Sequence, residues 1–276
     1  MKDEELIKIL DRDKGLTENA IRSVTFEDRY VGFHTTGNIP SIPASSIKGN
    51  IRSRIELSFK AKDGKARSCF IRATEPIPPP KRGMHGWRHH GIWGEVLLEN
   101  REACDATRDR QVCLVCDLFG TNGLQSLIGF SDFVGEGVRL ERLNLEYGMD
   151  VLAAPPNSRF DGSVNFLNLK PEELGLLLIG MGLRDSMKGR EVLIGRFKYR
   201  KEIKGYKLGR AIYRLDKIGL YQFSKPLSIN SITLMPGQSL EGDALNEFVK
   251  VIVANALHFY EGELKLKDEV SAVENL

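Results

Sequence analysis

The sequence predicts a mixed α+β protein, and three observations support that class. The 276 residues are 41% hydrophobic, which is enough to form a buried core. Apolar residues alternate with polar ones, as in strands, over 20–33 and 159–167. They recur at helical spacing after Ser46 and after Pro171. The order strand, helix, strands, then strand, helix, strand is compatible with one or two ferredoxin-like (RRM-like) βαββαβ units.

The first predicted helix begins near Ser45 or Ser46, because serine is a preferred N-cap residue and Pro43 keeps the preceding chain extended. Lys48 and Arg52 share one face of this helix near its start. Backbone amides and these two cations together predict an anion site. The residues expected to face the core lie one turn apart: Ile47, Ile51, Ile55 and Phe59.

Two further helices follow in the second half of the chain. One is predicted to open at Pro171, because proline is favoured at the first helical position and two acidic residues follow it. Its core residues are expected to be Leu174, Leu177, Leu178 and Met181. The other is a C-terminal helix over about 243–260.

We expect a single domain over 1–276, with the halves of its ferredoxin-like core at about 20–60 and 125–220. Between those halves, 61–124 is rich in proline, glycine, arginine and histidine and is interpreted as an insertion. The N-terminus has no signal-peptide character, and no apolar run is long enough to cross a bilayer. We therefore expect a cytoplasmic protein without a membrane segment.

The cysteines indicate a metal site inside this insertion. Four cysteines are too few for a disulfide scaffold in a chain of this length. Cys104, Cys113 and Cys116 supply three thiolates, and either His89 or His90 is expected to supply the fourth ligand of a structural Zn²⁺ site. Thiolate ligands favour zinc over magnesium or calcium. The alternative is three buried, reduced cysteines beside surface histidines.

Positive charge is concentrated between Arg184 and Lys217. This stretch holds twelve Lys or Arg against four acidic residues, a net charge of +8, whereas the remaining chain carries −5. Its centre, Gly195 to Arg210, interleaves glycines and aromatic residues with the cations. Charge, close backbone approach and ring faces together favour binding to a nucleic acid, and the alternative is a solvated basic loop.

Three segments occur in an order that resembles a known family. Residues 42–52 read IPASSIKGNIR and resemble the IPGSSLKGxxR signature of the RAMP superfamily. Residues 113–120, CLVCDLFG, resemble its CPVCxLFG element, and Gly195 to Arg210 resembles its glycine-rich GGxxSRGxGR loop. Ala44 replaces the customary glycine of the first signature. The nearest resemblance is to the RNA-binding backbone subunit of type III CRISPR effector complexes.

The resemblance implies one RAMP domain that binds CRISPR RNA without sequence preference, in antiviral defence. The implied partners are CRISPR RNA, complementary target RNA, and other RAMP subunits of a multisubunit complex, including copies of itself. Residue chemistry agrees, because cations bind phosphates and glycines permit close approach of a strand. The expected RNA-binding residues are Ser45, Ser46, Lys48, Arg52, Arg54, Gly195, Arg196, Lys198, Arg200, Lys204, Lys207 and Arg210.

The evidence for catalysis is weaker than that for binding. Type III backbone subunits that cleave target RNA resemble one another in carrying an aspartate in the loop before the first signature. Here that loop, 34–41, contains no carboxylate, so we assign no catalytic residue. One alternative is an endoribonuclease of the same superfamily that uses Asp28 or His34. A second alternative is an unrelated RNA-binding module stabilised by zinc.

Overall fold

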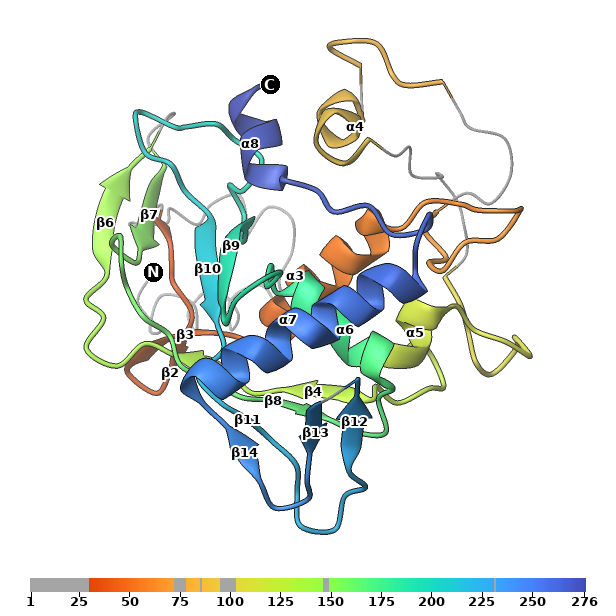
Figure 1. Cartoon of the computed structure of the whole chain (residues 1–276). Helices are drawn as coiled ribbons and strands as arrows, with labels where there is room; N and C mark the ends of the chain where they lie inside the picture. The colour runs from red at the N-terminus through yellow and green to blue at the C-terminus, as the bar shows by residue number, and fades with distance from the viewer. Residues whose placement is uncertain (1–29, 72–77, 85, 95–102, 146–148, 231) are drawn as a thin grey trace, which may run out of the picture. The chain divides into compact units, whose positions relative to one another are not determined.

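The computed structural model confirms a mixed α+β protein with small sheets (Figure 1). The chain divides into two compact units, Met1–Ser41 with Val134–Phe160 and Ile42–Phe133 with Asp161–Leu276. Within the described residues, no helix is both long and apolar enough to cross a membrane. The structure describes residues 30–71, 78–84, 86–94, 103–145, 149–230 and 232–276.

The first unit is built from short strands. One sheet has the order β1-β7-β6, with β1 parallel to β7 and β6 antiparallel to it. A second sheet has the order β2-β3-β5. Most of the strand expected at 20–33 lies outside the described residues, which begin within it at β1. The strand bounds are β1 Tyr30–Val31, β2 Thr35–Thr36, β3 Ile39–Ile42, β5 Phe133–Val134, β6 Glu141–Asn144 and β7 Asp150–Ala153.

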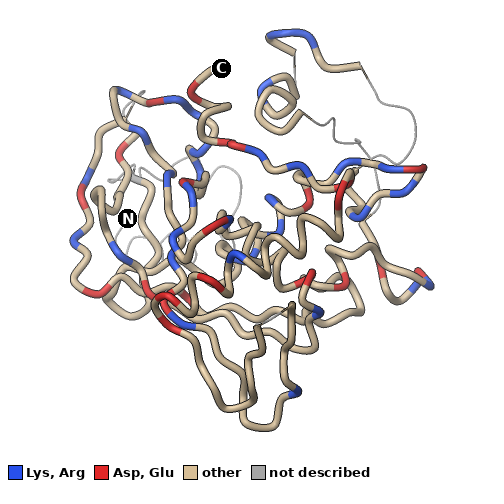
Figure 2. The backbone as a smooth tube through the Cα atoms, viewed as in Figure 1, with Lys and Arg blue, Asp and Glu red and all other residues tan. Residues whose placement is uncertain are grey.

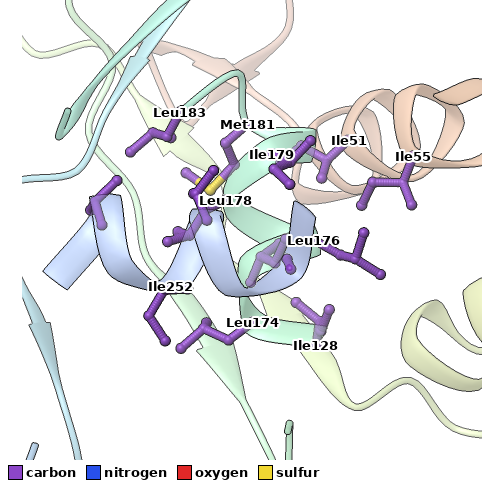
Figure 3. Packing of buried hydrophobic residues seen from close by; sticks show 14 of the residues in the cluster. Ile51, Ile55, Ile128, Leu174, Leu176, Leu178, Ile179, Met181, Leu183 and Ile252 are labelled. Carbon is purple, nitrogen blue, oxygen red and sulfur yellow. The ribbon is translucent and has the colours of Figure 1, made fainter. Parts of the chain in front are cut away.

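The core of the second unit is formed around three helices, α3 (Ala44–Ser58), α6 (Pro171–Gly180) and α7 (Gly242–Phe259). The helix α6 packs against both α3 and α7, and its apolar side chains are buried on all sides. Figure 3 shows side chains of the three helices meeting, with Ile128 of β4 among them. These helices lie where the spacing of apolar residues predicted them, and the four residues expected to face inward from α3 are all buried: Ile47, Ile51, Ile55 and Phe59.

Two glycines of α6 allow its neighbours to approach closely. A Cβ atom on Gly175 would lie 2.5 Å from Ala256 Cβ and 2.6 Å from the carbonyl oxygen of Ile252 on α7. A Cβ atom on Gly180 would lie 2.7 Å from Ile55 Cδ1 on α3. The helix spacing in this core therefore requires the absence of side chains at these positions.

The remaining strands of this unit pair in antiparallel twos: β4 (Ile128–Phe130) with β8 (Val164–Phe166), β9 (Lys188–Leu193) with β10 (Arg210–Arg214), β11 (Ile218–Gly219) with β14 (Ser239–Leu240), and β12 (Leu227–Ile229) with β13 (Ile232–Leu234). Three short helices complete it: α4 (Trp87–Trp93), α5 (Leu114–Phe119) and α8 (Glu269–Glu274). The described sheets have two or three strands each. A ferredoxin-like βαββαβ core therefore stays a prediction.

The start of α3 differs from the expectation that Ser45 or Ser46 caps it. The helix begins one residue earlier, at Ala44, and the N-cap position is held by Pro43, whose side chain has no acceptor. The amide of Ala44 instead donates to Asp132 Oδ1 at 2.8 Å. An acidic residue eighty-eight positions away therefore performs the capping role, and the two serine hydroxyls are left for other contacts.

We predict opposite stability effects for two glycine-to-alanine changes. Gly175→Ala should lower the free energy of unfolding by about 1–3 kcal/mol, because the added methyl group has to displace α7. Gly49→Ala is the matched control, because Gly49 is exposed on α3 and nothing lies within 4 Å of its Cβ position. It should raise stability by about 0.5–1 kcal/mol through helix propensity. Chemical denaturation measures both, and equal effects of the two changes would contradict the close packing.

Candidate nucleic-acid interface and metal centre

The loop of residues 194–209 connects β9 to β10 and carries much of the positive charge of this region (Figure 2). The amide of Ile194 donates to the carbonyl of Gly209 at 2.9 Å, which closes the base of the loop. Gly209 has a φ of +71°, and a Cβ atom there would collide with the Ile194 carbonyl. The base of this loop therefore requires glycine, for both its backbone angle and its space.

The tip of the loop is a small hairpin. Ile203 and Tyr206 are paired by reciprocal backbone hydrogen bonds of 3.0 and 2.9 Å. Lys204 and Gly205 form the turn between them, with φ values of +48° and +79°. Two consecutive left-handed residues are typical of the type I′ turn, which matches the twist of paired strands. The turn presents Lys204 at the exposed end of the loop.

The loop cations differ in exposure, from exposed side chains to the nearly buried side chain of Arg210. Arg196, Arg200 and Lys204 are exposed, and Lys198 is half-buried. Arg196 lies over the ring of its neighbour Phe197, with 5.7 Å from guanidinium carbon to ring centroid. These side chains are placed to meet a polyanion.

Lys207 and Arg210 instead connect the loop to α8. Lys207 Nζ lies 3.0 Å from Glu274 Oε2, and Arg210 Nη2 lies 3.5 Å from the other carboxylate oxygen. Arg210 also donates from Nη1 to the carbonyls of Lys198 and Leu208, and its side chain is 9% exposed. Arg210 therefore mainly holds the loop in shape.

The first turn of α3 presents polar groups outward. Ser45 and Ser46 are exposed and Lys48 is half-buried. Burial, and secondly the charge of Arg52, lower the pKa of Lys48, and an anion bound beside it would oppose this shift.

The second turn of α3 lies next to the base of the basic loop. Asn50 Nδ2 donates to the carbonyl of Leu193, the last residue of β9, at 2.7 Å. Tyr213 of β10 also reaches Asn50, with 3.5 Å between its hydroxyl and Oδ1. One turn separates Asn50 from Ser46, and one residue separates Leu193 from Gly195, so both candidate RNA-binding segments begin at this junction.

Arg54 is buried, and its contacts lie inside the protein, so the structure gives no support to the expectation that it contacts RNA. Its guanidinium binds the carboxylate of Glu269 with both Nε and Nη2, at 3.0–3.2 Å. Further bonds go to the carbonyls of Gly180 and Leu193 and to the side chain of Asn50. The helical spacing carried a signal for this burial, because Arg54 lies seven residues after Ile47 and three after Ile51, on the face that the apolar residues share.

Arg52 also points away from the first turn of α3. Its Nε donates to Glu56 at 2.8 Å and its Nη1 to the carbonyl of Gly120 at 2.8 Å. Its Nη2 lies 3.3 Å from Cys116 Sγ. Arg52 therefore links the helix to the cysteine cluster and offers little to a strand of RNA.

The four cysteines of the chain form one cluster, with all their sulfur atoms within 4.8 Å of one another. Cys69 and Cys116 are buried, and their sulfur atoms lie 3.8 Å apart. Tetrahedral zinc with Zn–S bonds of about 2.3 Å places sulfur atoms about 3.8 Å apart. The cluster could thus hold a structural metal ion such as zinc. Amides of Cys113 and Cys116 donate to the sulfur atoms of Cys104 and Cys113, an arrangement that favours thiolates.

Mutual repulsion opposes the ionisation of several of these thiols at once when no cation is bound. Hydrogen bonding from Cys113, with further bonds from the other thiols, lowers the pKa of Cys69 to about 5. Burial raises the pKa of Cys116 to about 11, and the negative charge of Cys69 acts in the same direction. One thiolate therefore opposes ionisation of its neighbours, and a divalent cation would relieve that repulsion.

The fourth ligand position is a correction to the sequence prediction. Cys69 completes the cluster, and neither His89 nor His90 belongs to any group of potential metal ligands within the described residues. The signal that could have found Cys69 is the cysteine count, because the chain holds four in total. Its distance of thirty-five positions from Cys104, across a proline-rich stretch, hid the association.

The two residues considered for catalysis lie in the other unit. His34 is exposed, and its Nδ1 lies 2.8 Å from Ser41 Oγ, which also lies 2.9 Å from Thr36 Oγ1. Asp28 lies outside the described residues. The contacts of His34 serve its own hairpin, so the structure adds no support for a catalytic role.

We predict that substitution of Cys69 lowers the zinc content of the protein and that substitution of His89 does not. The purified protein should hold about one zinc ion per chain, because four thiolates complete a tetrahedral site. Cys69→Ser should lower the bound zinc and destabilise the fold, whereas His89→Ala should keep the wild-type content. Elemental analysis measures both variants, and loss of zinc from His89→Ala with retention in Cys69→Ser would contradict the site.

We predict that Arg54→Ala destabilises the protein by about 3–5 kcal/mol, because it leaves the Glu269 carboxylate buried without its partner. Changing both residues together, Arg54→Met with Glu269→Met, should restore much of that loss. Denaturation of the single and double variants tests this coupling. Equal stability of Arg54→Ala and wild type would show that the pair is not formed.

Comparison with known protein families gave a match that spans most of the chain. A model of the RAMP superfamily matches residues 15–257, which include α3, the four cysteines and the loop between β9 and β10. A comparison with curated proteins found no match. The chain belongs to the RAMP superfamily of CRISPR-associated proteins.

Proposed function

We propose that the protein binds CRISPR RNA without sequence preference, as a backbone subunit of a type III CRISPR effector ribonucleoprotein. Membership of the RAMP superfamily implies a role in binding CRISPR RNA within multisubunit complexes. The observation that carries the proposal is the junction between Asn50 and Leu193, which joins α3, one turn beyond Ser46, to the base of the basic loop. Two segments far apart in the chain thereby form one RNA-binding surface.

On the α3 side, the binding groups are small and polar. The hydroxyls of Ser45 and Ser46 and the ammonium of Lys48 lie at the positive end of a fifteen-residue helix. The Asp132 carboxylate already accepts from the Ala44 amide at this end, so a phosphate would be bound by the two hydroxyls and the ammonium group. These groups recognise the backbone of a strand and no particular base.

On the loop side, the binding groups are cationic side chains and stretches of main chain at glycines. Arg196, Arg200 and Lys204 are exposed, and no atom lies within 4 Å of a Cβ position on Gly195 or Gly205. A strand can therefore approach the main chain here without meeting side chains. Guanidinium groups on phosphates give affinity that depends on salt and not on sequence.

The proposal extends to the fold and the partners that the resemblance implies. The chain forms a single RAMP domain with a ferredoxin-like core, and it assembles with other RAMP subunits, including copies of itself, along the CRISPR RNA. Sequence recognition is then left to pairing between the guide and complementary target RNA. The zinc-bound cysteine cluster is a structural element that fixes the segment before α5 against α3.

Cleavage of target RNA is not part of the proposal. The loop at 34–41 holds no carboxylate, and His34 bonds within its own hairpin. We expect a guide-bound complex to hold complementary RNA without cutting it, with or without Mg²⁺. Fragments at a regular spacing that disappear on substitution of Asp28 or His34 would instead show an endoribonuclease.

We predict that Arg196→Ala with Arg200→Ala weakens binding of single-stranded RNA to the same degree for every sequence tested. Loss of two phosphate contacts should reduce the slope of log affinity against log salt by about 1.4. The matched control is Lys225→Ala with Lys250→Ala, which removes two exposed lysines from other elements of the same unit. Fluorescence anisotropy with labelled oligonucleotides measures these affinities.

The proposal fails if the arginine and lysine double variants lose the same affinity, because binding would then depend on net charge alone. It also fails if the wild-type protein discriminates strongly between sequences without a guide.

A further inference from the structure

We infer that α4 and the residues that precede it form a second RNA-binding element, which extends the surface of the basic loop and contacts phosphates and bases of the same strand. This inference rests on the proposed function and adds to it a segment outside the three motifs of the family. It also gives a role to His89 and His90, which were expected from the sequence to bind Zn²⁺. The relevant segment is 81–94, without His85, which the structure does not describe.

The composition of this segment matches a polyanion partner. Residues 81–94 contain no acidic residue, and they hold Lys81, Arg82 and Arg88 together with three histidines. Lys81, Arg82 and Arg88 are exposed, and His89 and His90 are half-buried. Because the candidate metal ligands are the four cysteines, neither His89 nor His90 is assigned to that site.

Packing fixes α4 beside the base of the basic loop. Ile92 and Trp93 of α4 are buried in a cluster with Leu57 of α3, Leu193 of β9 and Val273 of α8. Tyr199 of the basic loop packs against the same cluster. The loop and α4 are thus held together by one small hydrophobic core, so a strand bound to the loop passes close to α4.

The charges of the two segments confirm that they are near each other. Burial, then the charges of His90 and Lys198, lower the pKa of His89. Arg210 in turn donates to the Lys198 carbonyl at 3.2 Å. His89 of α4 therefore lies near Lys198 of the basic loop, and the guanidinium of Arg210, which bonds to the same loop, is paired with Glu274.

Three buried nitrogen atoms in this region lack a hydrogen-bond partner within the described part of the chain: His89 Nε2, Trp93 Nε1 and Arg210 Nε. Buried polar atoms in native proteins are almost always bonded. The side chain of Arg210 is 9% exposed, and Trp93 is 3% exposed. The indole and guanidinium nitrogens can only donate, and all three atoms are shielded from solvent, so a strand on the surface would reach them only after a shift of α4.

An aromatic platform lies at the start of α4. The guanidinium of Arg82 lies over the ring of Trp87, with its central carbon 5.5 Å from the centroid. Aromatic and guanidinium planes are the groups on which unpaired bases stack. A strand that leaves the basic loop therefore meets cations and a stacking surface in succession.

The chain offers a local probe for this element, because both of its tryptophans, Trp87 and Trp93, lie in α4. Titration of the full-length protein with a 20-nucleotide uridine oligonucleotide should quench tryptophan fluorescence. The oligonucleotide concentration that gives half-maximal quenching should equal the concentration that gives the half-maximal change in anisotropy. Trp93→Phe isolates the signal of Trp87, and retained quenching there assigns the contact to the platform of Arg82 and Trp87.

Binding is tested with Arg82→Ala combined with Arg88→Ala. We expect weaker uridine binding, a salt slope lower by about 1.4, and unchanged zinc content. The charge reversal Arg88→Glu should weaken binding further, and Lys225→Ala with Lys250→Ala is the control.

Two results overturn the inference in distinguishable ways. If the Arg82 and Arg88 double variant binds RNA with wild-type affinity, while Arg196→Ala with Arg200→Ala lowers the affinity, then α4 is not an RNA-binding element. The proposed function is unaffected by that result. Absence of RNA binding by the wild-type protein rejects both.

Discussion

The guanidinium of Arg54 is the interaction on which the second unit depends. It binds Glu269 of α8, the carbonyl of Gly180 at the end of α6 and the carbonyl of Leu193 at the end of β9. A buried charge is tolerated only where such partners surround it, so these four elements have one compatible arrangement. That arrangement fixes α3 with its first turn outward and places the end of β9 beside Asn50. The proposed RNA-binding surface depends on this arrangement.

The cations of the family motifs perform two different tasks. Arg52, Arg54 and Arg210 point inward, where they connect α3 to the cysteine cluster, α3 to α8, and the loop to α8. Lys48, Arg196, Arg200 and Lys204 remain at least partly exposed. A basic residue within a motif is therefore not by itself evidence of an RNA contact. In the proposed function, the inward arginines act on RNA indirectly, by holding the outward cations in position.

Local features were predictable from the sequence, and long-range partners were not. Apolar spacing was sufficient for α3, α6 and α7, because helix periodicity is a property of neighbouring residues. The capping of Ala44 by Asp132, and the partnership of Arg54 with Glu269, depend on contacts 88 and 215 positions apart. No periodicity encodes such contacts. Cys69 was missed for the same reason, because its link to Cys104 is made in space, and the nearer histidines gave the simpler local pattern.

The central claim is that one strand of RNA runs over the first turn of α3, the basic loop and α4. Photochemical cross-linking of 4-thiouridine-containing guide RNA to the intact protein, followed by mass spectrometry of the attached peptides, tests it most directly. The account predicts cross-links in 44–48, 81–94 and 195–209, which lie in one compact unit. Cross-links confined to the strands β11 to β14, with none in these three segments, would contradict it.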